Sequence, residues 1–300
     1  MMKPQCPDSQ CSARNQAPLS RPIVRKGSYF RRSDGQRIRR YFCGRCGHSF
    51  SSGSRSACYR QKKRTLNHRL NLLLNSGVSQ RRAAILLRVN RKTVVRKFRF
   101  LAHEARLAHA EWLRELSRRP LASVQFDDLE TSEHSKCKPL SVALAVEPNT
   151  RKILGFQVAQ MPAKGHLARQ AFRKYGPRPD ERPRAWNALF HSLKPVMKSD
   201  AHWRSDENPH YPRRLKAIHP DCKHETVKGR RGCVAGQGEL KKIGFDPLFS
   251  LNHTCAMMRA NLNRLFRRTW CTTKNRAGLI DHLSLYVRYH NDVITRPGTL

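Results

Sequence analysis

Acidic residues are scarce in this sequence. In 300 residues, 21 Asp and Glu stand against 60 Lys and Arg, so the formal net charge is +39. A charge of this size opposes compaction unless a polyanion neutralises it, and phosphates are the expected counter-charge. The first hundred residues contain 25 Lys and Arg but only two acids, Asp8 and Asp34. Carboxylates that perform chemistry are therefore expected in the remaining two hundred residues.

Long apolar runs are also lacking. No window approaches eighteen consecutive apolar residues, and the first eleven residues contain no apolar signal-peptide core. We therefore expect no membrane partner, no secretion, and a cytoplasmic protein whose ten cysteines are reduced. Tandem repeats are absent too. With 38% apolar residues, the chain is long enough for two or three domains and at least one core.

Four early cysteines fall into two pairs. Cys43 and Cys46 form a Cys-x-x-Cys turn containing a glycine, whereas Cys6 and Cys11 are separated by four residues. Two cysteine pairs about thirty residues apart have the spacing of a tetrahedral zinc site. The four thiols are therefore predicted to hold Zn²⁺.

Between the cysteine pairs, residues 23–24 and 37–42 flank an Asp-Gly turn, which is typical of a β-hairpin. We predict a zinc ribbon over residues 1–58, in which the metal is structural because so small a segment cannot stabilise itself. One alternative is that His48 replaces a ligand. The other is that the cysteines are unpaired thiols in a disordered basic tail.

Residues 59–115 have the pattern of a helix-turn-helix DNA-binding domain. Leucines recur at helical spacing over 66–74, Ser79 is placed to cap a short helix, and Asn90 is placed to cap a third. The third helix carries Arg91, Lys92 and Arg96, which are our candidate DNA contacts in a major groove. A plain amphipathic linker with a solvated basic face is the alternative.

Residues 116–300 are expected to combine strands and helices. A short strand over 123–126 ends at Asp127, two further strands complete an antiparallel meander, and a later strand ends at Asp200. A basic insertion is expected at about 216–244. The other predicted elements are strands at 140–146, 153–158, 195–199 and 215–218, and helices at 166–175, 184–193, 252–268 and 279–289.

The order of these elements, together with four sequence segments, resembles the catalytic region of bacterial insertion-sequence transposases. The matching segments are Phe-Asp-Asp-Leu-Glu-Thr at 126–131, Lys-Pro-Leu-Ser-Val-Ala-Leu-Ala-Val at 138–146, Lys-Ser-Asp-Ala-His-Trp at 198–203, and a later run from Asn252-His253 to Lys274. The resemblance implies a multidomain α+β or α/β protein in which an RNase H-like mixed sheet flanked by helices follows the two DNA-binding modules. It also implies a nucleoid-associated bacterial enzyme.

The chemistry implied by the resemblance is two-metal phosphoryl transfer. Two Mg²⁺ or Mn²⁺ ions would activate water and then a 3′-hydroxyl for attack on a phosphodiester, held by the carboxylates of Asp127 and Asp200. Structural alternatives are that Asp127 is a polar strand end and Asp200 a helix cap. Asp128 ranks second because its side chain should point to the opposite face of the strand.

The third catalytic position departs from the acidic triad of this family. The resemblance places Asn252 there, where an amide oxygen can ligate magnesium but adds no charge. Arg259 lies two helical turns further on the same face and is our candidate for a contact with the DNA backbone. Glu239 is the competing third ligand. The second Cys/His grouping, Cys222, His224 and Cys233, lacks paired spacing. Trp203 and Trp270 are interpreted as packing residues, with base stacking as the alternative for Trp270.

The sequence therefore predicts a DNA transposase that binds the ends of an insertion sequence and carries out strand cleavage and strand transfer. Its partners would be double-stranded DNA, both element ends and target, and further copies of itself, since two ends must meet. One alternative is a zinc-ribbon and helix-turn-helix regulator whose nuclease-like domain is inactive because of Asn252. Another is a basic RNA-binding protein, which explains the charge but not the order of the aspartates.

Overall fold

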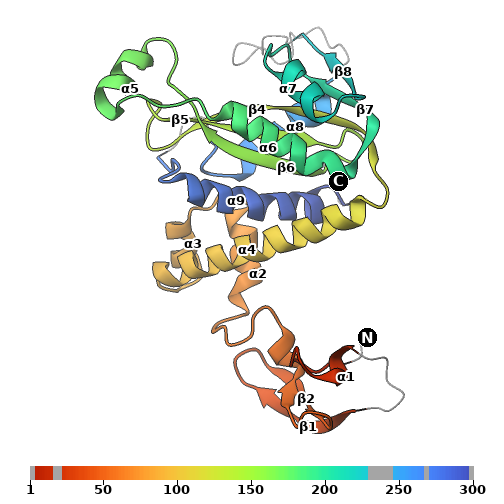
Figure 1. Ribbon diagram of the computed structural model, residues 1–300. Coiled ribbons are helices and arrows are strands. Elements are labelled where there is room, and N and C mark those ends of the chain that lie inside the picture. Colours follow the sequence, from red (N-terminus) through yellow and green to blue (C-terminus); the bar gives the residue numbers. More distant parts are fainter. Residues whose placement is uncertain (1–3, 16–21, 229–245, 267–269, 297–300) are drawn as a thin grey trace. The chain divides into compact units, whose positions relative to one another are not determined.

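The computed structural model in Figure 1 describes residues 4–15, 22–228, 246–266 and 270–296. By its internal contacts the chain divides into two compact units, Met1–Arg69 and Leu70–Leu300, and each is described here by itself. The fold is mixed α+β, with a three-stranded sheet in the first unit and a five-stranded mixed sheet in the second. None of the helices in the described ranges combines the length and the apolar character that a membrane span requires.

The first unit is a small antiparallel sheet. Strand β1 (Ile23–Arg31) pairs with β2 (Gln36–Cys43), and β2 pairs with the short β3 (Ser49–Ser51). The predicted hairpin is confirmed, because Arg31 opposes Gln36 across its turn. The short helices of this unit are α1 (Ser12–Asn15) and η1 (Ser52–Arg55).

Three helices open the larger unit and confirm the predicted helical pattern. They are α2 (Leu66–Leu74), which crosses the division between the units, α3 (Gln80–Leu86) and α4 (Arg91–Leu116). The side-chain oxygen of Ser79 accepts from Arg82 N–H and that of Asn90 from Lys92 N–H, as expected for caps. Buried Leu70, Ala83 and Phe98 join the three helices in one apolar cluster.

The five-stranded sheet has the order β6-β5-β4-β7-β8. Strands β4, β5 and β6 form the predicted antiparallel meander, whereas β7 runs parallel to β4 and β8 parallel to β7. The strands are β4 (Leu121–Ser132), β5 (Pro139–Val146), β6 (Ile153–Gln160), β7 (Met197–Ser205) and β8 (Lys223–Thr226). Residues 140–146 of β5 are all buried, because helices cover both faces of the sheet.

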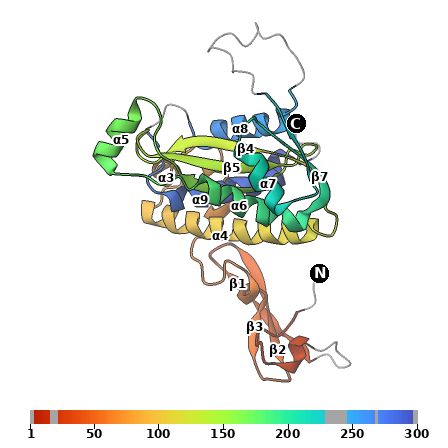
Figure 2. The same cartoon turned by 45° about the horizontal axis from the view of Figure 1, so that its top comes forward.

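Each face of the sheet has its own apolar core. On one face α6 (Arg182–Leu193) and α7 (Tyr211–Ile218) pack over Phe126, and on the other face α8 (Phe249–Asn261) and α9 (Arg276–Tyr289) pack over Leu129. Figure 2 shows α8 on the opposite side of the strands from α6 and α7. The remaining elements are α5 (Leu167–Tyr175), η2 (Lys194–Val196) and η4 (His290–Ile294).

Helices α4 and α9 lie side by side and bring the helical segment into the same compact unit as the sheet (Figure 1). His282 of α9 is buried where they meet. Its Nε2 contacts the carbonyl oxygen of Leu74 at 3.0 Å and its Nδ1 contacts Nε of Arg264 at 3.2 Å. Burial lowers the pKa of His282 to about 4, so the ring is neutral and Nδ1 accepts the arginine hydrogen bond. The helical segment predicted as a separate domain up to residue 115 is therefore continuous with the sheet by its contacts.

Some predicted boundaries are wrong. Both β4 and β7 extend beyond the residues expected to end them, so Asp127 and Asp200 are interior strand residues. The expected strand at 215–218 is part of helix α7, because Tyr211, Leu215 and Ile218 are buried at helical spacing. Helix α8 ends at Asn261 rather than near residue 268. The greater part of the predicted insertion, 229–244, lies outside the described residues.

Candidate functional site

The four cysteines of the first unit converge. The sulfur atoms of Cys6, Cys11, Cys43 and Cys46 all lie within 4.8 Å of one another. The Cys6 and Cys46 sulfurs are 3.5 Å apart, and those of Cys11 and Cys43 are 3.7 Å apart. Four thiolates at a zinc–sulfur distance of about 2.3 Å in a tetrahedron are separated by about 3.8 Å from one another. The cluster therefore has the size that a tetrahedral zinc ion requires.

Local backbone structure positions this cluster. Cys43 ends β2, and the chain turns so that Gly47 N–H donates to the carbonyl oxygen of Cys43 at 2.9 Å. Gly47 has a φ of +69°, which favours glycine at this position. His48 follows the turn and is exposed, and the cluster consists of the four cysteines. The prediction that these four residues can hold one metal ion is confirmed.

The thiols suit a soft cation such as zinc. Burial raises the pKa of the Cys6 thiol to about 12, so without a cation this sulfur stays protonated at neutral pH. Burial also acts on Cys43, but hydrogen bonds from the N–H groups of Cys46 and Arg45 outweigh it and lower the pKa of Cys43 to about 7. A bound metal favours the thiolate form of all four ligands, and its binding energy then contributes to folding.

The predicted DNA contacts lie together at the start of α4. Arg91, Lys92 and Arg96 are all exposed, whereas Val94 and Phe98 of the same helix are buried against α2 and α3. The helix therefore presents cationic side chains to solvent from a packed three-helix support. Their binding to DNA stays a prediction.

A second group of polar side chains surrounds Asp127 on β4. This strand pairs with β7 only as far as the Gln125–Arg204 position, so its edge is free of β7 from Phe126 onward. The hydroxyl of Tyr211, the first residue of α7, lies 3.5 Å from Asp127 Oδ1, and Asp128 N–H donates to the same oxygen at 2.7 Å. Asp127 is thus a half-buried carboxylate at the end of the paired region of the sheet.

The acidic neighbour of Asp127 is Asp206. Asp206 directly follows the end of β7, two residues beyond the last β4–β7 pair, and its charge acts on Asp127 two residues beyond the same pair on β4. Burial and, next, the negative charge of Asp206 raise the pKa of Asp127 to about 7. Asn208 N–H donates to Asp206 Oδ1 at 3.1 Å and so orients this carboxylate. We name Asp127 and Asp206 the aspartate pair.

The structure does not bring Asp200 to Asp127. The register of the two strands shifts between Leu121–Met197 and Ser123–His202, so Asp200 lies in a bulge of β7 opposite the first residues of β4. At about 3.3 Å per residue, five residues of strand separate this position from Asp127 by about 16 Å. Asp200 is also exposed. The expectation that these two side chains meet is therefore wrong, because the strand continues past Asp200 for five residues.

Asp128 points to the other face of the sheet, as predicted. Trp186 Nε1 of α6 contacts both carboxylate oxygens of Asp128 at 3.0 Å. Burial raises the pKa of Asp128, and the Trp186 hydrogen bond opposes that increase. Trp186 and Tyr211 pack edge to face at 5.1 Å, so one aromatic wall connects Asp128 with the aspartate pair. Tyr211 itself stays protonated, since burial and the charge of Asp128 raise its pKa well above the ordinary value.

Helix α8 runs along β4 on the Asp127 side. The side chain of Gln125 holds the start of this helix, accepting from Leu251 N–H at 3.0 Å and donating to the carbonyl oxygen of Pro247 at 2.7 Å. Cys255, one turn further on, lies close enough to Asp127 for that charge to contribute, after burial, to a thiol pKa of about 12. Sequence reasoning missed Cys255 as a neighbour of the pair.

The predicted third position, Asn252, therefore lies on the helix that adjoins the aspartate pair. It is exposed, and its Nδ2 donates to Asp246 Oδ2 at 2.9 Å, which leaves its side-chain oxygen to act as a ligand. Arg259 is half-buried two turns along α8 and lines a cavity with Glu130 and Lys164. The competing residue Glu239 lies outside the described residues.

The oxygen atoms near Asp127 are suitable ligands for a hard cation such as Mg²⁺. Asp127, Asp206 and the Asn252 oxygen are the type of ligand that Mg²⁺ prefers. Among the described residues, however, three or more donor atoms of Cys, His, Asp or Glu lie close enough together to hold one ion at the cysteine cluster and not at the aspartate pair. At the aspartate pair, the charge of Asp206 acts on Asp127, but in the described ranges no third donor atom is gathered with these two carboxylates.

Other residues singled out in the sequence have ordinary roles. Cys222 is buried in a core, and His224 contacts the hydroxyl of Ser205 at 3.0 Å. Cys233 lies outside the described residues. Trp203 is fully buried, which confirms its packing role. Trp270 is 98% exposed, so the packing interpretation is wrong for it and base stacking stays a prediction.

Comparison with known proteins does not assign this chain to a family. No family model matches the chain, and no curated protein matches it. The functional argument therefore depends on the residues and their arrangement.

Proposed function

We propose that this chain is a DNA transposase of the insertion-sequence type, in which an RNase H-like catalytic domain cuts and joins DNA strands. The observation that carries the proposal is the aspartate pair. Asp127 lies on β4 and Asp206 directly follows β7, the parallel neighbour of β4 in a β6-β5-β4-β7-β8 sheet whose first three strands form a meander. This strand order, with acids at the end of the central strand pairing, is the arrangement that the resemblance implies.

Asp206 replaces Asp200 in the proposed catalytic set. The set is then Asp127 and Asp206 as carboxylate ligands, with the amide oxygen of Asn252 from α8. When bound, Mg²⁺ or Mn²⁺ supplies an activated water or 3′-hydroxyl for in-line attack on a phosphodiester. The residues fit such ions, because a divalent cation would offset the burial and the negative charge of Asp206 that raise the pKa of Asp127.

The protein contributes positioning around this chemistry. Tyr211 donates to Asp127, and Asn208 N–H donates to Asp206, so both carboxylates are oriented by neighbouring donors. Arg259, on the same helix as Asn252, is proposed to contact the DNA backbone. The half-buried setting of Asp127 excludes part of the surrounding water, which strengthens its interaction with a cation.

The N-terminal modules are proposed to bind the element ends as duplex DNA. Strand β1 of the cysteine unit is exposed along 24–30 and carries Arg25, Lys26, Tyr29 and Phe30. Cations interleaved with aromatic rings suit contact with phosphates and bases. In the larger unit Arg91, Lys92 and Arg96 offer a second cationic face. We also propose that the protein acts as a multimer, since two DNA ends must be joined.

The test compares Asp206→Asn with the matched variant Asp200→Asn. Magnesium-dependent nicking of DNA that carries the flanks of the gene is measured with purified full-length protein. We expect Asp127→Asn and Asp206→Asn to lower the cleavage rate at least about 100-fold, since even supporting residues of a metal site are worth 10–100-fold. Asp200→Asn should keep the rate within about threefold.

Two outcomes would contradict this assignment. If Asp200→Asn loses cleavage and Asp206→Asn keeps it, the second ligand is Asp200 after all. If the wild-type protein binds the flanking DNA but never cleaves it with Mg²⁺ or Mn²⁺, the chain is a non-catalytic DNA-binding regulator. The second outcome is favoured by one observation, that the third position carries Asn252, whose amide adds no charge to hold the cations.

A further inference from the structure

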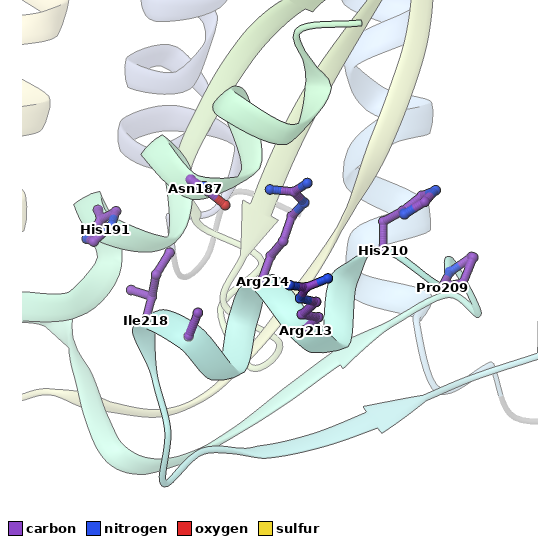
Figure 3. Close-up of a pocket in the computed structure, with 8 residues that line it drawn as sticks. Asn187, His191, Pro209, His210, Arg213, Arg214 and Ile218 are labelled. Atoms are coloured by element: carbon purple, nitrogen blue, oxygen red, sulfur yellow. The ribbon is translucent and has the colours of Figure 1, made fainter.

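A cavity of about 540 Å³ lies between α6 and α7, on the face of the sheet opposite α8. Figure 3 shows His191 and Asn187 of α6 on one side, and Arg213 and Arg214 of α7 with the preceding His210 on the other. We name this cavity the basic pocket. Its volume falls in the range of pockets that hold small organic ligands or a single nucleotide.

The charge of the basic pocket is of one sign. Two arginines and two histidines line it, and its described lining contains no Asp or Glu. Arg213 and Arg214 of α7 lie three and four residues after the N-cap His210, so the start of the helix brings the three side chains together. Arginines elsewhere in this unit, such as Arg182 and Arg276, are paired with carboxylates at 2.6 and 2.5 Å. Among the described residues neither Arg213 nor Arg214 makes such an ion pair.

The side-chain amide of Asn187 is a second feature of this pocket. Its Oδ1 is buried and has no hydrogen-bond partner within the described ranges. A buried acceptor without a partner costs free energy unless a ligand or water satisfies it. The pocket therefore offers both cationic donors for an anion and an amide for a polar group attached to that anion.

Trp186 connects the basic pocket with the aspartates. The guanidinium of Arg214 lies 5.9 Å from the Trp186 ring centroid, and His210 stacks on the same ring at 6.3 Å. On its indole nitrogen Trp186 donates to Asp128, and its ring packs against Tyr211, whose hydroxyl reaches Asp127. A molecule in the basic pocket is thus separated from the aspartates by one aromatic layer.

We propose that the basic pocket binds a phosphodiester of the DNA strand that enters the aspartate pair, together with its attached nucleotide. The proposal rests on the proposed function and deepens it by naming a strand-positioning subsite. Guanidinium groups bind phosphate oxygens through paired N–H donors, and Arg213 and Arg214 have no competing carboxylate in the described chain. Arg213 and Arg214 would hold the phosphate, and the Asn187 amide would meet the sugar or base.

Binding is tested without catalysis. The full-length protein is titrated, without added Mg²⁺, into a fluorescein-labelled single-stranded oligonucleotide of twelve nucleotides, and anisotropy is followed over a salt series. The variant Arg213→Gln/Arg214→Gln is compared with Arg169→Gln/Arg173→Gln, which removes the same charge from exposed positions on α5. We expect the affinity to fall at least tenfold in the pocket variant and less than threefold in the control. In the pocket variant, the slope of log affinity against log salt concentration should also fall by about one phosphate contact or more. Equal losses in both variants would overturn the proposal.

A second measurement uses the unmodified protein and does not depend on variant folding. Arginines are modified with phenylglyoxal, with and without the oligonucleotide, and located by peptide mass spectrometry. Protection of Arg213 and Arg214 but not of Arg169 and Arg173 supports the proposal. If inorganic phosphate at the same phosphate concentration protects them equally well, the pocket is a free-phosphate site and the DNA assignment fails.

Cleavage assays on the same preparations separate the two proposals. A wild-type protein that cleaves DNA, with a pocket variant indistinguishable from the α5 control in binding and protection, overturns the pocket alone. A wild-type protein that never cleaves, with selective loss of oligonucleotide binding in the pocket variant, overturns the catalytic proposal and supports the pocket as a DNA-strand site.

Discussion

The two compact units are stabilised by different means. In the first unit the buried apolar and thiol side chains among the described residues are Ile38, Phe50 and three of the four cluster cysteines. In the second unit separate apolar clusters fill both faces of a five-stranded sheet. The four thiols of the first unit lie close enough to hold a metal, and we propose that its stability depends on that metal, whereas the second unit depends on apolar surface removed from water. Removing metal should therefore affect one unit, and removing a core side chain the other.

The largest expected effect is the loss of the first unit with its metal. Cys43→Ser, or a zinc chelator, should unfold the hairpin, because a structural zinc ion contributes about 10–16 kcal/mol in small domains. Hydrogen exchange measured by mass spectrometry should lose protection in β1 and β2 and keep it in β4 and β5. Cys58→Ser, which alters a thiol outside the cluster, should retain one zinc per chain. If β1 and β2 keep full protection in metal-free protein, the first unit does not depend on a metal for its stability.

The reciprocal change is Phe126→Ala. Phe126 packs against Phe190 at 5.1 Å, Tyr211 at 5.0 Å and Trp203 at 5.8 Å, and such a cavity costs about 3–5 kcal/mol. The free energy of unfolding of the larger unit, measured in denaturant, should fall by this amount while zinc content stays unchanged. Phe172→Ala removes a 66% exposed ring of α5 and should change stability by less than about 0.5 kcal/mol. A parallel loss of zinc would mean that the two units are not independent.

A smaller effect sharpens the account of the larger unit. The pKa of Asp127 is raised to about 7, so its ionisation opposes the folded state. Stability from this residue is complete below pH 4 and declines as the pH rises through about 7. Without Mg²⁺, Asp127→Asn should therefore raise the free energy of unfolding at pH 8 by at most about 4 kcal/mol for three pKa units, and at pH 5, about one unit above the ordinary pKa, by less than about 2 kcal/mol.

The control for this titration is Asp206→Asn. Removing the neighbouring charge should lower the pKa of Asp127 and reduce the difference between pH 5 and pH 8. Thermal unfolding at the two pH values measures both variants. If Asp127→Asn changes the free energy of unfolding equally at pH 5 and pH 8, ionisation of Asp127 does not destabilise the folded state.

Local sequence signals predicted the local structure well. The Cys-x-x-Cys turn, the hairpin around Asp34, and the caps at Ser79 and Asn90 depend on residues within a few positions of one another. Each of these is confirmed, because a turn or a cap is decided by the side chains that form it. The antiparallel meander followed from short apolar segments joined by short connections in the same way.

The partner of Asp127 was not predicted, although a signal was available. Ala201, Trp203 and Ser205 alternate as buried residues, which extends β7 to Ser205 and puts Asp206 at its end. The bulge at 198–201 shifts β7 against β4 by several residues, and this shift, which decides the partner of Asp127, is not visible in the sequence. Strand register depends on a neighbour more than seventy positions away, and no local pattern specifies it.

The amino-acid sequence by itself determined the cysteine ligands, the helix caps and the alternation of the strands, because each depends on atoms close together along the chain. Tertiary structure alone decided that Asp206 rather than Asp200 lies beside Asp127, that α4 joins α9, and that a basic pocket forms between α6 and α7. These depend on register and helix packing, in which burial of apolar surface over the whole unit selects one arrangement among many that local preferences allow.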